Sequence, residues 1–498
     1  MAEHGSVRVQ GIDPRTGRLV AESIQATTPE QLETLVQAAA RALPAWSATP
    51  ATHRAAALRR VAAVLDDGGD EVIRLAGLET GLDPARLAGE LARTTGQLRL
   101  FAALIERGEH LDVVVSESSA EIGRPDLRRM LQARGPVAVF AASNFPFAFS
   151  VVGGDTASAL AAGCPVVVKA HEGHPATSAA TAAFVTRALA EAGAPYGVFG
   201  IAFGAAAGGP LVAHPEVSAV GFTGSFGAGV TLQAIASGRD RPIPFYGELS
   251  STNPAIVLPL AAAGRPREIA EAYVASLTLG AGQFCTKPGL LFAPHGSPLL
   301  EEARAAVAAS TGGPALSHRI RDGYRSFTAW DGVPVIATGE SGGAVLAMTP
   351  ELRAVGLADF AANIDELAVE RFGPAGLLIT YNDVAELLAT LPRLPGSLAG
   401  AVHADASEAA DAARVAEALR RRVGRLIMNG WPTGVAVCAA QHHGGPWPAT
   451  TDARYTSVGA KAIERWLVPI VYQDWPDELL PEELRRDNHL GVPRHIEA

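Results

Sequence analysis

Cysteine is rare in this chain, and a strongly basic charge is absent. Three cysteines occur in 498 residues, Cys164, Cys285 and Cys438, and no two of them form a Cys-x-x-Cys pair. This pattern excludes a disulfide framework and predicts no metal site. A formal net charge of -10 excludes the basic surface that nucleic-acid binding requires. We therefore expect a protein of the reducing cytoplasm with no nucleic-acid partner.

The chain also lacks a clean apolar segment that would cross a membrane or direct secretion. Residues 135–154 carry no charge, but Asn144, Pro146 and a glycine pair at the end interrupt them. We interpret this run as a buried strand, a functional loop and the start of a helix, and we expect no membrane association. Residues 1–14 have neither an apolar core nor a basic lead, so no secretory signal is expected.

Hydrophobic residues, by contrast, are abundant at 48%, and the length suggests two to four domains. Thr28 to Gln31 form a capping box that opens a helix, and we expect the first hundred residues to be helical. Residues 111–115 and 127–133 predict a protruding two-stranded element. Short apolar strands then alternate with alanine-rich helices, which predicts a parallel, doubly wound sheet. These strands are expected at residues 137–140, 165–168, 198–201 and 217–220.

A second α/β region is expected from residue 248 into the 440s, as a separate lobe. Apolar strands at residues 255–258 and 376–379 alternate there with helical segments. The tail then predicts a short helix at 462–466 and a strand at 468–472.

Cys285 lies in Gly282-Gln283-Phe284-Cys285-Thr286-Lys287, between a glycine-flexible approach and a lysine. The thiolate is the reactive form, so polar or cationic neighbours that favour the anion matter. We interpret Cys285 as a nucleophile, and the alternative is a buried structural cysteine. Only three of the 41 Lys plus Arg residues are lysines, and two of them, Lys169 and Lys287, lie in candidate motifs. The role of Lys287 is left open.

Asn144 and Lys169 each follow a strand of the predicted parallel sheet, where such sheets meet ligands. The Asn144 amide is suited to stabilising an oxyanion formed when a thiolate adds to a carbonyl. The alternative is an asparagine that satisfies loop backbone groups. Lys169 suits ribose or phosphate oxygens.

Thr223, Gly224, Ser225 and Gly229 follow another strand and open a predicted helix. Glycines and helix amides suit a pyrophosphate, although the pattern is neither a nucleoside-triphosphatase loop nor Gly-x-Gly-x-x-Gly. Further on, a carboxylate at Glu248 is suited to deprotonating a hydrolytic water. By itself a single glutamate is more often a solvated surface residue.

Together these motifs resemble the aldehyde dehydrogenase superfamily over nearly the whole chain. They occur in the family's order as Asn144-Phe-Pro, Lys169, Phe222-Thr-Gly-Ser225, Glu248 before Asn253-Pro254, Gly282-Gln-Phe-Cys285 and Glu370-Arg-Phe-Gly-Pro374. The resemblance implies a Rossmann-like cofactor lobe, an α/β catalytic lobe and a β oligomerisation arm with the tail, in a homo-oligomer, dimer or tetramer. The expected ranges are 1–110 with 137–247, 248–446, and 111–136 with 460–498.

The same resemblance implies a mechanism. Cys285 attacks an aldehyde, Asn144 and the Cys285 backbone N–H hold the oxyanion, and hydride leaves to a nicotinamide. Glu248 then activates the water that hydrolyses the thioester. Ser225 is expected on the pyrophosphate, with Glu370 and Phe372 on the nicotinamide ribose.

A closer resemblance, carried by residues 429–435 and 441–459, is to the branch of the family that contains α-ketoglutaric semialdehyde (2,5-dioxovalerate) dehydrogenases. Its substrate bears a carboxylate and a 2-oxo group, so the pocket needs donors or a cation. Arg454, His442 or Thr433 are candidates, and Arg454 is equally a candidate for a structural or interface residue. The expected substrate pocket comprises Phe147, Phe284, Trp431, Thr433 and Arg454.

The cofactor is expected to be NADP or NAD, with a slight preference for NADP. This branch commonly uses NADP, yet Glu172 lies three residues after Lys169, where a carboxylate repels a 2′-phosphate. His171 and His174 are expected to offset that repulsion.

Other activities remain as alternatives at this point. The aldehyde is alternatively succinic semialdehyde or a fatty aldehyde. A coenzyme A-acylating enzyme would not need Glu248. A cysteine hydrolase would pair Cys285 with a histidine, and none of the 13 histidines has a recognisable signature for that role. The last alternative is a catalytically silent binding protein on the same scaffold.

Overall fold

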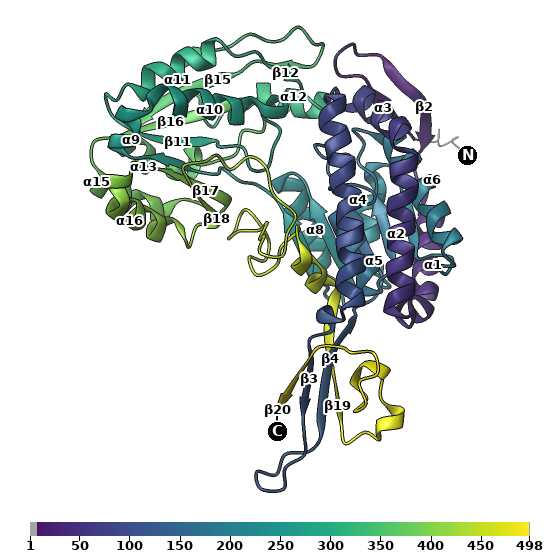
Figure 1. The fold of residues 1–498 in the computed structure, drawn as a ribbon. Helices are drawn as coiled ribbons and strands as arrows, with labels where there is room; N and C mark the ends of the chain where they lie inside the picture. The colour runs from purple at the N-terminus through teal and green to yellow at the C-terminus, as the bar shows by residue number, and fades with distance from the viewer. Residues whose placement is uncertain (1–6, 498) are drawn as a thin grey trace.

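The computed structural model describes residues 7–497, and a five-stranded parallel sheet lies at the centre of its first half (Figure 1). The strand order is β7-β6-β5-β8-β9. The strands are β5 (Val137–Phe140), β6 (Val166–Lys169), β7 (Phe199–Ala202), β8 (Ala219–Thr223) and β9 (Phe245–Glu248). Buried on both faces, β5 and β6 are apolar almost throughout, as parallel strands between helical layers must be. The predicted doubly wound sheet is confirmed.

The register of this sheet brings the carboxyl ends of β5, β6, β8 and β9 to one edge. Phe140 lies opposite both Lys169 and Phe222, and Thr223 lies opposite Glu248. The loops that follow β5, β6, β8 and β9 therefore leave the sheet side by side.

Helices cover both faces of this sheet and share large apolar cores with it. They are α1 (Pro29–Ser47), α2 (Ala51–Asp67), α3 (Gly69–Thr80), α4 (Pro84–Glu106), α5 (Gly154–Ala162), α6 (Pro175–Glu191), α7 (Gly208–Ala213) and α8 (Phe226–Ser237). The predicted capping box is present at α1, where the Gln31 N–H donates to Thr28 Oγ1 at 3.2 Å. Residues 135–154 form β5, a loop and the first residue of α5, as expected.

The expectation of an all-helical first hundred residues is wrong for residues 8–25. They form an antiparallel hairpin of β1 (Arg8–Ile12) and β2 (Leu19–Gln25). The segment from Asp13 to Arg18 forms the tight turn that reverses the chain. Within residues 7–497, no helix is long and apolar enough to cross a membrane.

A seven-stranded sheet forms the second half, in the order β13-β15-β16-β11-β10-β17-β18. Its strands are β10 (Ala255–Val257), β11 (Leu290–Pro294), β13 (Val335–Thr338), β15 (Glu351–Gly356), β16 (Ala375–Tyr381), β17 (Ser397–His403) and β18 (Val423–Met428). Only the β13–β15 pair among these strands is antiparallel. Its helices are α9 (Pro259–Gly264), α10 (Pro266–Thr278), α11 (Leu299–Ala308), α12 (His318–Arg325), α13 (Leu357–Ala362), α14 (Ile364–Leu367), α15 (Val384–Thr390) and α16 (Ala409–Leu419).

A four-stranded sheet projects from the body of the molecule as an arm (Figure 1). It combines β3 (Val113–Ser116) and β4 (Leu127–Ala133) with two strands from the end of the chain, β19 (Leu467–Gln473) and β20 (Arg494–Glu497). The predicted two-stranded element and tail strand are therefore present, and β19 pairs with β4 along its whole length. A short 3-10 helix, Ala460–Trp466, precedes β19 where a short helix was predicted.

Candidate active site

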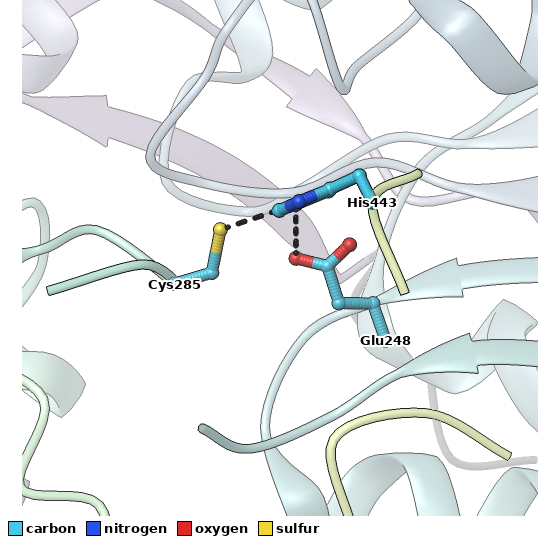
Figure 2. A group of neighbouring side chains, drawn as sticks. All are labelled: Glu248, Cys285 and His443. Carbon is cyan, nitrogen blue, oxygen red and sulfur yellow. Dashed lines mark hydrogen bonds and ion pairs between the residues drawn. The ribbon is translucent and has the colours of Figure 1, made fainter. Parts of the chain in front are cut away.

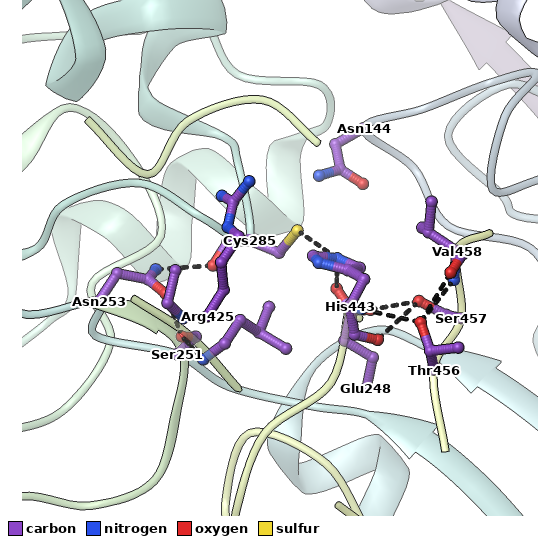
Figure 3. Close-up of polar contacts among 12 residues, drawn as sticks. Asn144, Glu248, Ser251, Asn253, Cys285, Arg425, His443, Thr456, Ser457 and Val458 are labelled. Carbon is purple, nitrogen blue, oxygen red and sulfur yellow. Dashed lines mark hydrogen bonds and ion pairs between the residues drawn. The ribbon is translucent and has the colours of Figure 1, made fainter. Parts of the chain in front are cut away.

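Cys285 lies at the junction of the two halves, in a loop that follows α10 and a kinked 3-10 turn. Gly282 has a φ of 69°, and a Cβ there would lie 2.3 Å from the Gly373 backbone. Only glycine permits this approach, which docks the nucleophile loop against the segment that begins at Glu370. Asn253 holds the same loop from the other side, since its Nδ2 donates to the carbonyls of Cys285 at 2.8 Å and Lys287 at 2.9 Å (Figure 3).

Lys287 is buried, and its side chain links the nucleophile loop to the segment that follows Glu370. Its Nζ donates to the carbonyls of Arg371 at 2.9 Å and Ala375 at 2.8 Å. Burial lowers the pKa of Lys287 to about 8, against the opposing charge of Glu370. Lys287, whose role the sequence analysis left open, thus orders the backbone around Cys285.

Three side chains from distant parts of the sequence converge at the nucleophile (Figure 2). The Cys285 Sγ lies 3.6 Å from the His443 Nε2, and the same nitrogen lies 3.2 Å from the Glu248 Oε1. A carboxylate can only accept, so the hydrogen between Glu248 and His443 belongs to Nε2. His443 therefore presents an N–H to both the carboxylate and the sulfur.

The position of His443 is set by its surroundings. Its backbone N–H donates to the Thr456 Oγ1 at 2.8 Å, and the Ser457 hydroxyl donates to the second oxygen of Glu248 at 3.1 Å. Its ring packs 6.1 Å from that of Phe149. The sequence analysis found no histidine with a recognisable signature for pairing with Cys285, and the structure brings His443 to that position. The only sequence signal was the His-His pair inside the 441–459 motif, because the contact joins residues 158 positions apart.

The electrostatics of the site keep the resting thiol protonated. Burial, then the charge of Glu248, raises the pKa of Cys285 well above its usual value, and Arg93 opposes this. Burial also acts to raise the pKa of Glu248, but His443, Cys285 and Ser457 together lower it. The sequence predicted neighbours that favour the thiolate. The structure instead pairs a neutral thiol with an ionised carboxylate that can take its proton.

Asn144 shares the cavity of Cys285, as the sequence predicted. Its Nδ2 donates to the Gln283 carbonyl at 3.0 Å, which places the amide against the nucleophile loop (Figure 3). The loop that carries Asn144 is held by Glu90 of α4, whose Oε1 accepts the N–H groups of Phe147 at 2.8 Å and Ala148 at 3.0 Å.

One cavity joins the nucleophile to the strand ends of the first sheet. The predicted residues that line it are Asn144, His171, Thr223, Gly224, Ser225, Glu248, Cys285, Glu370 and Phe372. Ser225 begins α8, and its side chain makes no capping bond with that helix, so its hydroxyl is open to a ligand. Gly229 lies behind this loop, where a Cβ would meet the Leu249 side chain at 2.1 Å. These features fit a dinucleotide whose pyrophosphate rests on the start of α8.

The Lys169 ammonium is at the carboxyl end of β6 and forms an ion pair with Glu172. It also donates to the Ala170 carbonyl at 2.9 Å. Burial, reinforced by the charges of His174, Lys169 and Arg319, lowers the pKa of His171 to about 3. His171 is therefore neutral and supplies no positive charge to offset Glu172, contrary to expectation. His174 is buried and hydrogen-bonded to Ala142 and Ser178.

The structure corrects the expected substrate pocket. The Phe147 side chain is fully buried in the hydrophobic core and cannot contact substrate. Trp431 packs between Tyr273 and His403. Thr433 is hydrogen-bonded to Ser276, and the Arg454 guanidinium lies over Tyr455 on an exposed segment. Within residues 7–497, none of these four lines the cavity of Cys285.

Phe284, the fifth expected pocket residue, is adjacent to Cys285 in the sequence but is buried and does not line the cavity either. Its ring packs edge-on against Phe145 and beneath the Arg86 guanidinium, at 5.2 Å and 4.8 Å. Arg86 is one of two arginines that α4 brings toward the site, and the other is Arg93. Neither was identified from the sequence. Their seven-residue spacing, with Glu90 between them, was the available sign that one face of this helix carries charge inward.

A parallel sheet with a cavity at its carboxyl edge, and a cysteine beside a carboxylate in the lining of that cavity, are the features of an oxidoreductase that binds a nucleotide cofactor. Residues 2–321 match the aldehyde dehydrogenase family, and the chain belongs to that family. It is an NAD(P)-dependent aldehyde dehydrogenase.

Similar proteins span nearly the whole chain. Alpha-ketoglutaric semialdehyde dehydrogenase 2 of Azospirillum brasilense is 44% identical over 98% of this chain and 95% of its own length. The alpha-ketoglutaric semialdehyde dehydrogenase of Acinetobacter baylyi is 40% identical over 97% of this chain and 93% of its own. The crystal structure of an NADP-dependent enzyme of E. coli superposes with a TM-score of 0.78, at 25% identity, over 94% of each chain.

Proposed function

We propose that this enzyme oxidises α-ketoglutaric semialdehyde to 2-oxoglutarate, with Arg93 holding the substrate carboxylate. The names of the two relatives support the substrate, and the observation that carries the proposal is the state of Arg93. Its Nε and Nη2 atoms are buried and have no hydrogen-bond partner within residues 7–497. Burying the N–H groups of a guanidinium without an acceptor raises the free energy of the folded protein. An anionic ligand that accepted from these groups would remove that cost.

Aromatic packing connects Arg93 to the residues around Cys285. Its guanidinium lies over the Phe149 ring at 5.7 Å, and Phe149 in turn packs against His443. Its charge acts on both Cys285 and Glu248. A substrate carboxylate bound by Arg93 would hold the aldehyde carbon near Cys285.

Two other arginines near the site, Arg86 and Arg425, already have partners, whereas Arg319 lines the cavity with an exposed side chain. Arg86 donates to the Asn144 carbonyl at 2.8 Å, and Arg425 donates to the carbonyls of Pro432 and Gly434. They order loops around the cavity, and Arg425 appears beside Cys285 in Figure 3. Arg93 is therefore the better candidate to bind a free carboxylate than either of them, or than Arg454.

The proposed reaction uses the converging side chains in sequence. Glu248 takes the thiol proton as Sγ adds to the aldehyde, and the His443 N–H stabilises the developing thiolate. Asn144 donates to the oxyanion. When bound, NAD(P) supplies the hydride acceptor. After it releases the thiol proton to solvent, Glu248 deprotonates the water that hydrolyses the thioester. The role of Lys169 is to position the cofactor.

Replacement of Arg93 tests the substrate assignment. Arg93→Gln should lower kcat/KM for α-ketoglutaric semialdehyde about 10- to 100-fold, as expected for a lost charge-assisted hydrogen bond. It should spare propanal, which has no carboxylate. Arg99→Gln is the matched control, because Arg99 lies on α4 but is exposed and pairs with Asp66. An equal loss with both aldehydes would contradict a carboxylate-binding role.

A substrate panel separates the alternatives. Steady-state assays with α-ketoglutaric semialdehyde, succinic semialdehyde and a long aliphatic aldehyde should rank the first highest. Succinic semialdehyde shares the carboxylate but lacks the 2-oxo group. A preference for the aliphatic aldehyde would overturn the proposed substrate.

The expected preference for NADP over NAD stays a prediction. The neutral His171 removes one of its supports, while the Lys169–Glu172 ion pair partly neutralises the carboxylate. We propose this ion pair as the element that discriminates between the two cofactors.

We also propose that the arm mediates a homo-oligomer in the cytoplasm. Large apolar side chains are exposed along it, at Ile122, Val471, Trp475, Leu479, Leu490 and Ile496. Their exposure is typical of a protein interface. Light scattering of the intact chain and of a Val471→Glu, Trp475→Glu variant tests this, and an unchanged mass would contradict it.

A further inference from the structure

Glu248, Cys285 and His443 offer one oxygen, one sulfur and one nitrogen to a common point. These donor atoms all lie within 4.8 Å of one another (Figure 2). The sequence predicted no metal site, because no pair of cysteines has metal-ligand spacing. Donors brought together by the fold need no such spacing.

We propose that these three side chains form a binding site for a thiophilic divalent cation, best matched by Zn²⁺, whose occupancy reversibly inhibits the enzyme. The inference goes beyond the proposed function, since it does not depend on which aldehyde is oxidised.

Two of the three donor separations match tetrahedral zinc. With Zn–S of about 2.3 Å and Zn–N and Zn–O of about 2.0 Å, tetrahedral angles separate sulfur from nitrogen by about 3.5 Å and nitrogen from oxygen by about 3.3 Å. The corresponding separations here are 3.6 Å for Cys285 to His443 and 3.2 Å for His443 to Glu248. The Cys285 Sγ lies within 4.8 Å of the Glu248 carboxylate, so an ion that drew these two donors to the tetrahedral separation of about 3.5 Å would fill three of its four positions and leave the fourth to water.

Neighbouring groups hold all three ligands in place. Ser457 donates to the second Glu248 oxygen, Thr456 accepts the His443 backbone N–H, and Asn253 donates to the Cys285 carbonyl. Such supporting contacts orient metal ligands and raise affinity. Binding breaks the Cys285 S–H bond and the His443 Nε2–H bond: the thiol proton leaves to solvent, the neutral imidazole changes to the tautomer protonated at Nδ1, and S–Zn and N–Zn bonds form with no change of oxidation state. The carboxylate and the thiolate together balance the charge of the ion.

Zinc bound here would occupy the sulfur lone pair that attacks the aldehyde and the carboxylate that activates water. The expected effect is inhibition that competes with aldehyde and is reversed by a chelator. Mg²⁺ should not replace Zn²⁺, because a thiolate is a poor ligand for a hard cation.

The test measures binding directly on the full-length, cofactor-free protein in a phosphine reductant. Isothermal titration with Zn²⁺ should show one strong site per chain, and Co²⁺ should produce a thiolate-to-cobalt charge-transfer band. Cys285→Ser should abolish the band, and His443→Asn and Glu248→Gln should each weaken Zn²⁺ affinity at least tenfold. Cys438→Ser and His442→Asn are the matched controls, and both should bind as the wild type does.

Three results would overturn the proposal: no stoichiometric Zn²⁺ binding, an undiminished cobalt band in Cys285→Ser, or inhibition that EDTA fails to reverse. A protein that binds Zn²⁺ as described but does not oxidise α-ketoglutaric semialdehyde would refute only the proposed substrate.

Discussion

The cofactor side and the aldehyde side of the cavity are built differently. The proposed cofactor side is built at the carboxyl ends of parallel strands, such as the end of β8, where Gly224 and Ser225 follow Thr223. The proposed aldehyde side combines α4, which carries Arg93, with a segment near the end of the chain that carries His443, 3.6 Å from the Cys285 Sγ. Neighbouring strands with fixed register place the first set. Only the packing of distant segments places the second.

Among the variants that test this contrast, Glu248→Gln should lower the turnover rate the most. In Glu248→Gln, Cys285 can still form the thioester once ionised, but the hydrolytic water loses its base. We expect a burst of NAD(P)H stoichiometric with active sites, followed by turnover slowed about 10²- to 10⁴-fold. Stopped-flow absorbance measures both phases. Cys285→Ser, the control, should show no burst while binding cofactor normally, and unimpaired steady-state turnover in Glu248→Gln would refute the role.

Loss of the His443 imidazole should have the second-largest effect, a decrease in the rate of the burst. His443→Phe removes the N–H that faces both the sulfur and the carboxylate, while the backbone bond to Thr456 does not require the side chain. A lost hydrogen bond to a charged group is worth about 2 kcal/mol, or about 30-fold in the rate of the burst. His442→Asn should react normally. If the burst in His443→Phe had the wild-type rate, His443 would not stabilise the thiolate and its role would be only structural.

The pH dependence of Cys285 reactivity tests the electrostatics of the aldehyde side. Because its pKa is raised, alkylation by iodoacetamide should accelerate as pH rises, with a midpoint above that of an ordinary thiol. Glu248→Gln removes the negative charge that contributes to the raised pKa, so the midpoint should move to lower pH.

This measurement is cleanest in a Cys438→Ser background, which removes the exposed thiol. Cys164 is buried, and burial raises its pKa to about 11, so it should stay unreactive. A midpoint that moved to higher pH in Glu248→Gln would contradict the assigned charge interaction.

The smallest effect is expected on the cofactor side. Glu172→Gln removes a partly exposed carboxylate and frees Lys169, which should favour a 2′-phosphate. The ratio of kcat/KM for NADP to that for NAD should rise by up to about fivefold, the range of an exposed charge interaction. Steady-state kinetics with both cofactors measure it. A ratio that falls would exclude contact between Glu172 and the adenosine ribose.

Part of the site was predictable because it depends on local sequence. Asn144, Ser225 and Glu248 each directly follow or end an apolar strand, and parallel strands place such residues at one edge. The family resemblance added Glu370 and Phe372, which line the same cavity. The hairpin at residues 8–25 and the core position of Phe147 were missed, because a short strand and a buried aromatic residue have no distinct local pattern.

The sequence by itself determined the parallel sheet and the family, and it marked Cys285 as the expected nucleophile, since each is carried by short motifs or by the spacing of apolar residues. Only the tertiary structure decided that a neutral thiol faces an ionised Glu248, that Lys287 ties the backbone, and that His443 and Arg93 converge on Cys285. Burial and charge set the protonation of a buried group, and both arise from side chains that are far apart in sequence.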